Sequence, residues 1–129
     1  MTTQLDDGRE IINRLDPHLQ DALRAKFEGV VPGFTDSLVE WAYGHHYARP
    51  GLDMKTRQLC TVAALTALGG QTGPQLKANI RNSLSAGASR TEITEAIWQM
   101  AVYGGLPAAI NGLNAAMEVF AEDGAASEA

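Results

Sequence analysis

Apolar residues recur along most of the chain at the three- and four-residue spacing of an amphipathic α-helix. This period constrains the possible folds more than any other feature of the sequence. It is clearest after Ser89, where Ile93, Ile97 and Met100 follow one helical face, and where Ser89 and Glu92 form the capping-box pattern that starts a helix. No segment shows a convincing strand pattern, so the sequence predicts an all-α fold.

Glycine- and proline-containing breaks divide the chain into about six predicted helices. Asp16 followed by Pro17 suits a helix start, and Gly87 suits the position just after a helix end. The helices are expected at about residues 17–30, 34–46, 54–68, 75–86, 90–104 and 107–120. A chain of 129 residues has room for one core. We therefore predict a single domain over residues 1–129, with its core at about 8–122.

Two of these helices carry more apolar surface than one small domain can bury. The segment from Leu59 to Leu68 is apolar almost all round, and the helix after Ser89 has a second apolar surface with Trp98 and Val102. A monomer of this size cannot enclose such helices, because its surface is large for its volume. The pattern predicts a homo-oligomer.

The charge balance and apolar pattern restrict the classes of partner that the protein can bind. The chain has 10 basic and 15 acidic side chains, a net charge of −5, and no cluster of lysine and arginine, which argues against nucleic acid. No apolar run approaches the roughly 18 residues needed to span a bilayer, so no membrane partner is expected. The first seven residues lack the basic and apolar blocks of a signal peptide, and we expect a cytoplasmic protein.

Three segments, in order along the chain, carry a family resemblance. Gly44–Asp53 (GHHYARPGLD) resembles the pattern G-x-x-W/Y-x-R-P-G-L-D. Lys55–Leu59 opens a helix similar to K/R-T-R-x-L followed by A-L-G, here Ala67–Gly69. Ala101–Ala109 looks like A-V-Y-x-G-x-P-A-A. On these motifs the chain is identified as a member of the carboxymuconolactone decarboxylase family, with a match over roughly residues 8 to 122.

The resemblance implies an all-α, alkyl hydroperoxidase D-like fold built around a central helical hairpin and assembled as trimers or hexamers. It also implies a small-molecule substrate and no cofactor. The founding activity is decarboxylation of γ-carboxymuconolactone to a 3-oxoadipate enol lactone, a step of aromatic catabolism.

A sister branch, resembling alkyl hydroperoxidase D, reduces peroxides through a Cys-x-x-Cys pair. This chain has one cysteine, Cys60, inside an apolar helix, where we expect a small buried hydrophobic side chain. A thiol-peroxidase reading, which would need a reactive Cys60, is therefore the third choice.

Two positions depart from the decarboxylase pattern. The helix after A-L-G carries a Glu and, four residues on, a His in that branch, and here these places fall on Gln75 and Asn79. Spacing i, i+4 keeps both on one helix face. Amides cannot act as a general acid or base, but they can donate hydrogen bonds to a developing oxyanion.

The decarboxylation chemistry needs a cation for the substrate carboxylate, hydrogen-bond donors and a titratable acid. Arg49 lies in a connector, where it either anchors a carboxylate or forms a structural ion pair. Arg57 is a second candidate, with a buried or intersubunit salt bridge as its alternative. Tyr47 and Tyr103 complete the substrate-binding set, and packing is the alternative for both.

His45 and His46 are the candidate proton donors, because histidine changes charge near neutral pH. The alternative for each is a hydrogen-bonded histidine at a helix end. An adjacent pair is a poor start for a site that needs three or four convergent ligands, so no metal is predicted.

Two main hypotheses follow. The first is a cofactor-free enzyme that decarboxylates, or isomerises by proton transfer, a small carboxylated lactone or related ring compound. The second is a non-catalytic binding or assembly protein that kept the fold and lost the chemistry, as Gln75 and Asn79 suggest.

Overall fold

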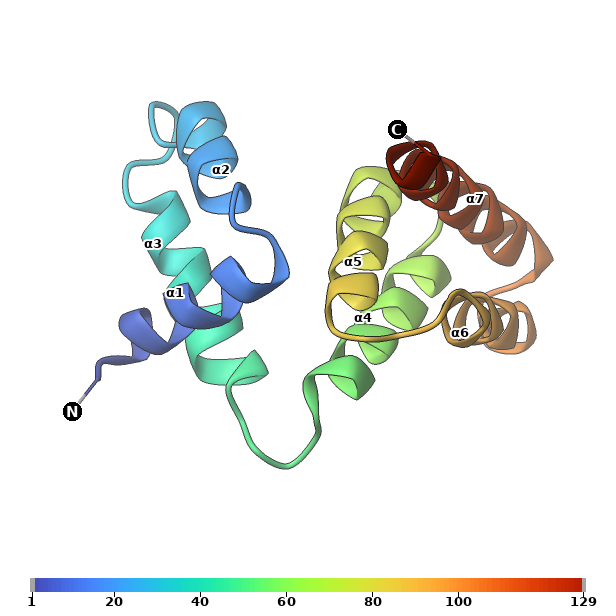
Figure 1. Ribbon diagram of the computed structural model, residues 1–129, viewed down its shortest axis with the longest axis horizontal. Helices are drawn as coiled ribbons and strands as arrows, with labels where there is room; N and C mark the ends of the chain where they lie inside the picture. Colours follow the sequence, from blue (N-terminus) through green and yellow to red (C-terminus); the bar gives the residue numbers. More distant parts are fainter. Residues whose placement is uncertain (1, 129) are drawn as a thin grey trace. The chain divides into compact units, whose positions relative to one another are not determined.

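The computed structural model describes residues 2–128, and the side chains of residues 2–122 (Figure 1). The chain forms two compact units that divide between Asp53 and Met54, and each is described by itself. The first unit contains α1 (Gln4–Leu15), α2 (Leu19–Phe27), α3 (Phe34–Leu38) and the π-helix η1 (Val39–Tyr47). The second contains α4 (Met54–Leu68), the 3₁₀-helix η2 (Gly70–Thr72), α5 (Gly73–Ser85), α6 (Arg90–Tyr103) and α7 (Leu106–Glu128). Every one of these elements is helical, which confirms the all-α prediction, whereas the single domain stays a prediction.

The first unit is organised around the crossing of α1 and η1. Gly8 on α1 is buried, and a Cβ there would collide with the carbonyl oxygen of Val39. Gly44 on η1 is equally tight, because its Cβ would collide with the carbonyl oxygen of Gln4. Ile12, one turn after Gly8 on α1, is fully buried. Two glycines therefore let the backbones of the two helices approach directly.

Helix α1 was missing from the sequence-based expectation. Its start is well defined, because Thr3 and Asp6 form a reciprocal capping box. Its apolar face, however, is short and passes through Gly8, a residue that disfavours helix interiors. The helix is stabilised by packing against η1, which a local pattern does not reveal.

The predicted helix at 34–46 is present, but its second half is not an α-helix. An α-helix gives way at Val39 to a π-helix, in which each turn holds more residues. Val39 and Tyr43 are the buried residues of this segment, whereas Trp41 is 64% exposed. The wider turn rotates successive side chains differently about the axis, and this moves the buried face.

The second unit contains the helical hairpin formed by α4 and α5, packed with α6 and α7 (Figure 1). Its core is apolar and comes from all four helices: Val62, Leu76, Ile80, Ile93, Ile97, Ala115, Ala116 and Val119. The α7 glycine Gly112 makes room for this packing, because a Cβ there would lie 2.8 Å from the side chain of Ile97.

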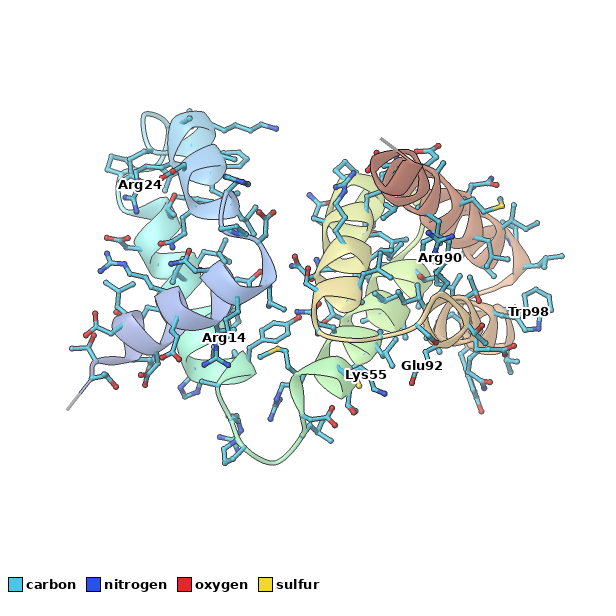
Figure 2. All side chains as sticks on the ribbon, in the orientation of Figure 1. Arg14, Arg24, Lys55, Arg90, Glu92 and Trp98 are labelled. Atoms are coloured by element: carbon cyan, nitrogen blue, oxygen red, sulfur yellow. The ribbon has the colours of Figure 1, made fainter. Side chains whose placement is uncertain are left out.

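Several local predictions in this unit are confirmed. Helix α4 spans Met54–Leu68, as expected. Ser89 and Glu92 form the expected capping box at the start of α6, and Gly87 has a φ of 97°, the left-handed conformation that suits a glycine after a helix end. Glu92 also pairs with Lys55 of α4 at 3.0 Å, so the cap of one helix is joined to another (Figure 2).

Burial on α4 differs from the expectation. Within the chain, only one face of this helix is buried, that of Gln58, Val62 and Thr66. Cys60 is exposed, so its predicted burial is wrong for the single chain. Gln58 is fully buried, and neither its amide nitrogen nor its amide oxygen has a hydrogen-bond partner among the described residues.

Candidate functional site

The π-helix η1 carries both candidate histidines. His45 and His46 are exposed, and their ring centroids lie 5.0 Å apart in an edge-on arrangement. The indole ring of Trp41 meets His46 in the same way at 4.6 Å. The result is an exposed cluster of three aromatic rings, the Trp41–His45–His46 cluster, in which both imidazoles are open to solvent.

Two tyrosines lie on another side of η1. Tyr47 is half-buried and stacks on Tyr43, with ring centroids 5.2 Å apart and an interplanar angle of 20°. Burial raises the pKa of Tyr43 to about 12, and Tyr47 and Asp16 add to the shift. The Tyr43 hydroxyl therefore stays protonated at neutral pH, which fits a packing role and not that of an acid.

The connector after η1 begins at Ala48 and carries Arg49, which is exposed. The backbone N–H of Arg49 donates to the carbonyl oxygen of His46 at 3.2 Å. The candidate carboxylate anchor is thereby tied by its backbone to the end of the helix that presents the histidines. The sequence-predicted residues His45, His46, Tyr47 and Arg49 thus lie within one short stretch of the first unit.

An apolar surface pocket of about 460 Å³ adjoins the same helix. It is lined by Val31, Pro32, Gly33, Phe34, Ser37, Leu38 and Trp41. None of these side chains titrates near neutral pH, but Trp41 also contacts His46. The indole therefore joins the wall of this pocket to the histidine cluster.

The other candidates lie in the second unit. The side-chain amide of Asn79 donates to the backbone carbonyl oxygen of Gln75 at 2.8 Å, so the Asn79 side chain lies over the turn of α5 that carries Gln75. Gln75 is exposed and Asn79 is half-buried. Arg57 is half-buried on α4, and Tyr103 at the end of α6 is 84% exposed.

A pocket of about 250 Å³, which the sequence did not reveal, lies in the second unit where α4 leads into α5. It is lined by Thr66, Gly69, Gly70, Gly73, Leu76, Ala108, Asn111 and Gly112. Its polar side chains are a hydroxyl and an amide, which can bind a ligand but cannot transfer a proton near neutral pH. The cluster of glycines around residue 70 was the only available signal, and it also reads as a helix break.

The described residues show neither a metal-binding cluster nor a membrane span. Among the residues that the structure describes, no three histidine, cysteine, aspartate or glutamate side chains gather as they would around a metal ion. None of the described helices combines the length and apolarity that a membrane crossing requires.

The fold defines an all-α protein of the alkyl hydroperoxidase D-like type. It contains a helical hairpin, and the family motifs lie on η1, α4 and α6. Residues 32–118 match the family model of the carboxymuconolactone decarboxylase family. The chain therefore belongs to the carboxymuconolactone decarboxylase family.

Curated relatives agree with this assignment. An uncharacterised 15.0 kDa protein from the nqo9–nqo10 intergenic region of Paracoccus denitrificans is 39% identical over 92% of this chain and 89% of its own. The 4-carboxymuconolactone decarboxylase of Acinetobacter baylyi is 36% identical over 74% of this chain and 69% of its own. The nitrosuccinic acid decarboxylase of Metarhizium robertsii is 33% identical over 74% of this chain and 65% of its own.

Proposed function

We propose that the protein is a cofactor-free enzyme that decarboxylates, or isomerises by proton transfer, a small carboxylated lactone or a related intermediate of aromatic catabolism. The carrying observation is the exposed His45–His46 pair, held on a motif-bearing helix whose end is bonded to the backbone of Arg49. The similarity to two proteins named as decarboxylases supports the reaction class.

In this proposal, the guanidinium of Arg49 binds a substrate carboxylate through charge-assisted hydrogen bonds. When the carboxylate to be lost leaves as CO₂, the electron pair of the broken C–C bond moves into the ring carbonyl and forms a dienolate. A histidinium from the His45–His46 pair then donates its proton to carbon, and the neutral imidazole regains a proton from water.

On α5 of the second unit, the amides of Gln75 and Asn79 are candidate donors to an oxyanion. The Asn79 amide has two N–H groups, and one of them donates to the backbone carbonyl of Gln75. The other N–H group and the Gln75 amide can donate to an oxyanion. Removing one such donor costs about 10²- to 10³-fold in kcat in enzymes that depend on it.

The test is incubation with γ-carboxymuconolactone, with CO₂ release and product formation followed directly. We expect His45→Asn or His46→Asn, whichever removes the proton donor, to lower kcat by about 10²- to 10⁴-fold. Arg49→Ala should mainly raise KM. His18→Asn, at the third and exposed histidine, is the matched control and should leave turnover unchanged. No turnover by the wild type, with ligand binding unaffected in Arg49→Ala, would contradict the proposal.

The alternative function is ligand binding without catalysis. The pocket in the second unit favours it, because none of its lining side chains titrates near neutral pH. Calorimetric titration with small carboxylated lactones separates the two functions, since this alternative requires saturable binding without any product. Asn111→Leu, which replaces the pocket's amide, should then weaken binding.

A further inference from the structure

The contact between Trp41 and His46 depends on the π-helix. In an α-helix, residues five apart are rotated by about 140° from each other, and neighbours on one face are three or four apart. Trp41 and His46 are five apart, yet their ring centroids lie at 4.6 Å. In a π-helix residue i bonds residue i+5, so residues at this separation are neighbours. The contact between Trp41 and His46 is therefore a product of the π register.

Helix α1 contacts the backbone of η1 where that register begins. In a π-helix the N–H of Gly44 points to the carbonyl oxygen of Val39, and a Cβ placed at Gly8 would meet both of these atoms. The side-chain amide of Gln4 donates to the next carbonyl oxygen, that of Glu40, at 3.1 Å. One face of α1 thus packs over one widened bond and adds a hydrogen bond to the carbonyl beside it.

We infer that α1 holds η1 in the π register, and that Gly8, Gly44 and Gln4 are positioning residues for the His45–His46 pair. The inference deepens the proposed function and rests on it for the catalytic role of the pair. The π-helix is rare and usually limited to a single turn, so nine residues in this form need support from outside the helix. Gly8 and Gly44 allow the close approach, and Gln4 supplies the additional bond.

Addition of one methyl group at Gly8 should break this arrangement. Because the Cβ would meet backbone atoms of η1, α1 must move away, and the bond from Gln4 to Glu40 is then lost. Without it, η1 is expected to relax towards the α-helical register, in which Trp41 and His46 diverge. Gly29→Ala is the matched control in the same unit, since a Cβ there has no atom within 4 Å.

Tryptophan fluorescence tests the register without any substrate. In a Trp98→Phe background, Trp41 is the remaining tryptophan of the chain. Histidine side chains change charge between about pH 5 and pH 8, and a protonated imidazole in contact with indole quenches its emission. Lowering the pH from about 8 to about 5 should therefore dim Trp41. His46→Asn should abolish this change. Gly8→Ala should lose it while keeping the helical circular dichroism, and Gly29→Ala should retain it.

The fluorescence of the Gly8→Ala and Gln4→Ala variants decides whether α1 holds the π register. A Gly8→Ala variant that folds and is quenched like the parent overturns the inference. If Gly8→Ala does not fold, Gln4→Ala decides, because it removes the bond to Glu40 without adding bulk: weakened quenching supports the inference, and unchanged quenching overturns it.

Turnover distinguishes this inference from the proposed function. With an active wild type, Gly8→Ala should lower kcat by about 10- to 100-fold, because the histidines move. Lost quenching with unchanged kcat would overturn the positioning role. A wild type that turns nothing over would end the proposed function, while the fluorescence would still report on the register.

Discussion

Gln58 is a residue whose burial is unfavourable for the stability of the protein. A buried amide without hydrogen-bond partners costs about 1–3 kcal/mol, because the group loses its bonds to water. Gln58 is fully buried on the face of α4 that carries Val62, and its amide atoms have no partner among the described residues. Burial therefore does not explain why this position carries an amide.

We expect Gln58→Met to raise the free energy of unfolding by about 1 kcal/mol or more. Methionine has a similar length and loses no hydrogen bond on burial. Denaturant unfolding measures the change, with Gln99→Met as the control, because Gln99 is an exposed helical position where the same exchange should have an effect within about 0.5 kcal/mol. A less stable Gln58→Met variant would indicate that the amide is satisfied, for example by ordered water.

At the scale of elements, η1 couples the first unit to pH through Tyr43. Burial raises the pKa of this phenol to about 12, above the usual value of 10.0. The folded state then holds the proton more tightly than the unfolded state. The contribution of Tyr43 to the free energy of unfolding is therefore fully present below pH 10 and is lost as the pH rises towards 12. A rise in pKa from 10.0 to about 12 corresponds to a loss of about 2–3 kcal/mol of unfolding free energy at high pH.

Comparison of the wild type with Tyr43→Phe isolates this contribution. We expect the wild type to lose on the order of 2 kcal/mol more than Tyr43→Phe when unfolding is measured at about pH 9 and about pH 11.5. The other tyrosines are common to both proteins and cancel in the comparison. Parallel loss of stability in the two proteins would mean that Tyr43 is not kept from ionising by the fold.

At the scale of the whole molecule, the second unit presents an apolar surface. Its exposed large residues are Leu68, Trp98, Val102, Tyr103, Leu106, Ile110 and Met117. Figure 2 shows the Trp98 ring pointing away from the other helices of this unit. An exposed apolar surface of this kind is typical of proteins that associate, and we propose that it is covered in a homo-oligomer.

Because the family resemblance implies trimers or hexamers, we expect light scattering to give three or six times the chain mass of 13.8 kDa. Val102→Glu, at a side chain that is 71% exposed, should shift the mass downwards without unfolding the chain, because it places a charge in the contact surface. Asn13→Asp adds a negative charge at an exposed polar position of α1, outside this surface, and should leave the assembly intact. A wild type that scatters as one chain would contradict the prediction.

Several features were determined by the sequence alone. The helical period and its breaks predicted the approximate bounds of α4 and the start of α6, and the motifs identified the family. Ser89, Glu92 and Gly87 succeeded as signals because caps depend on atoms only a few residues apart. The spacing of Gln75 and Asn79 likewise predicted their shared face, since i, i+4 contacts are local to a helix.

The tertiary structure decided the features that depend on distant partners. Helix α1 and the π register of η1 stabilise each other through Gly8, Gly44 and Gln4, residues that carry no local signal for such a contact. The exposure of Cys60 and Trp41 followed from which face of each helix found a neighbour. Local patterns encode which residues form a helix, but packing between segments far apart in sequence selects the helix register and the buried face.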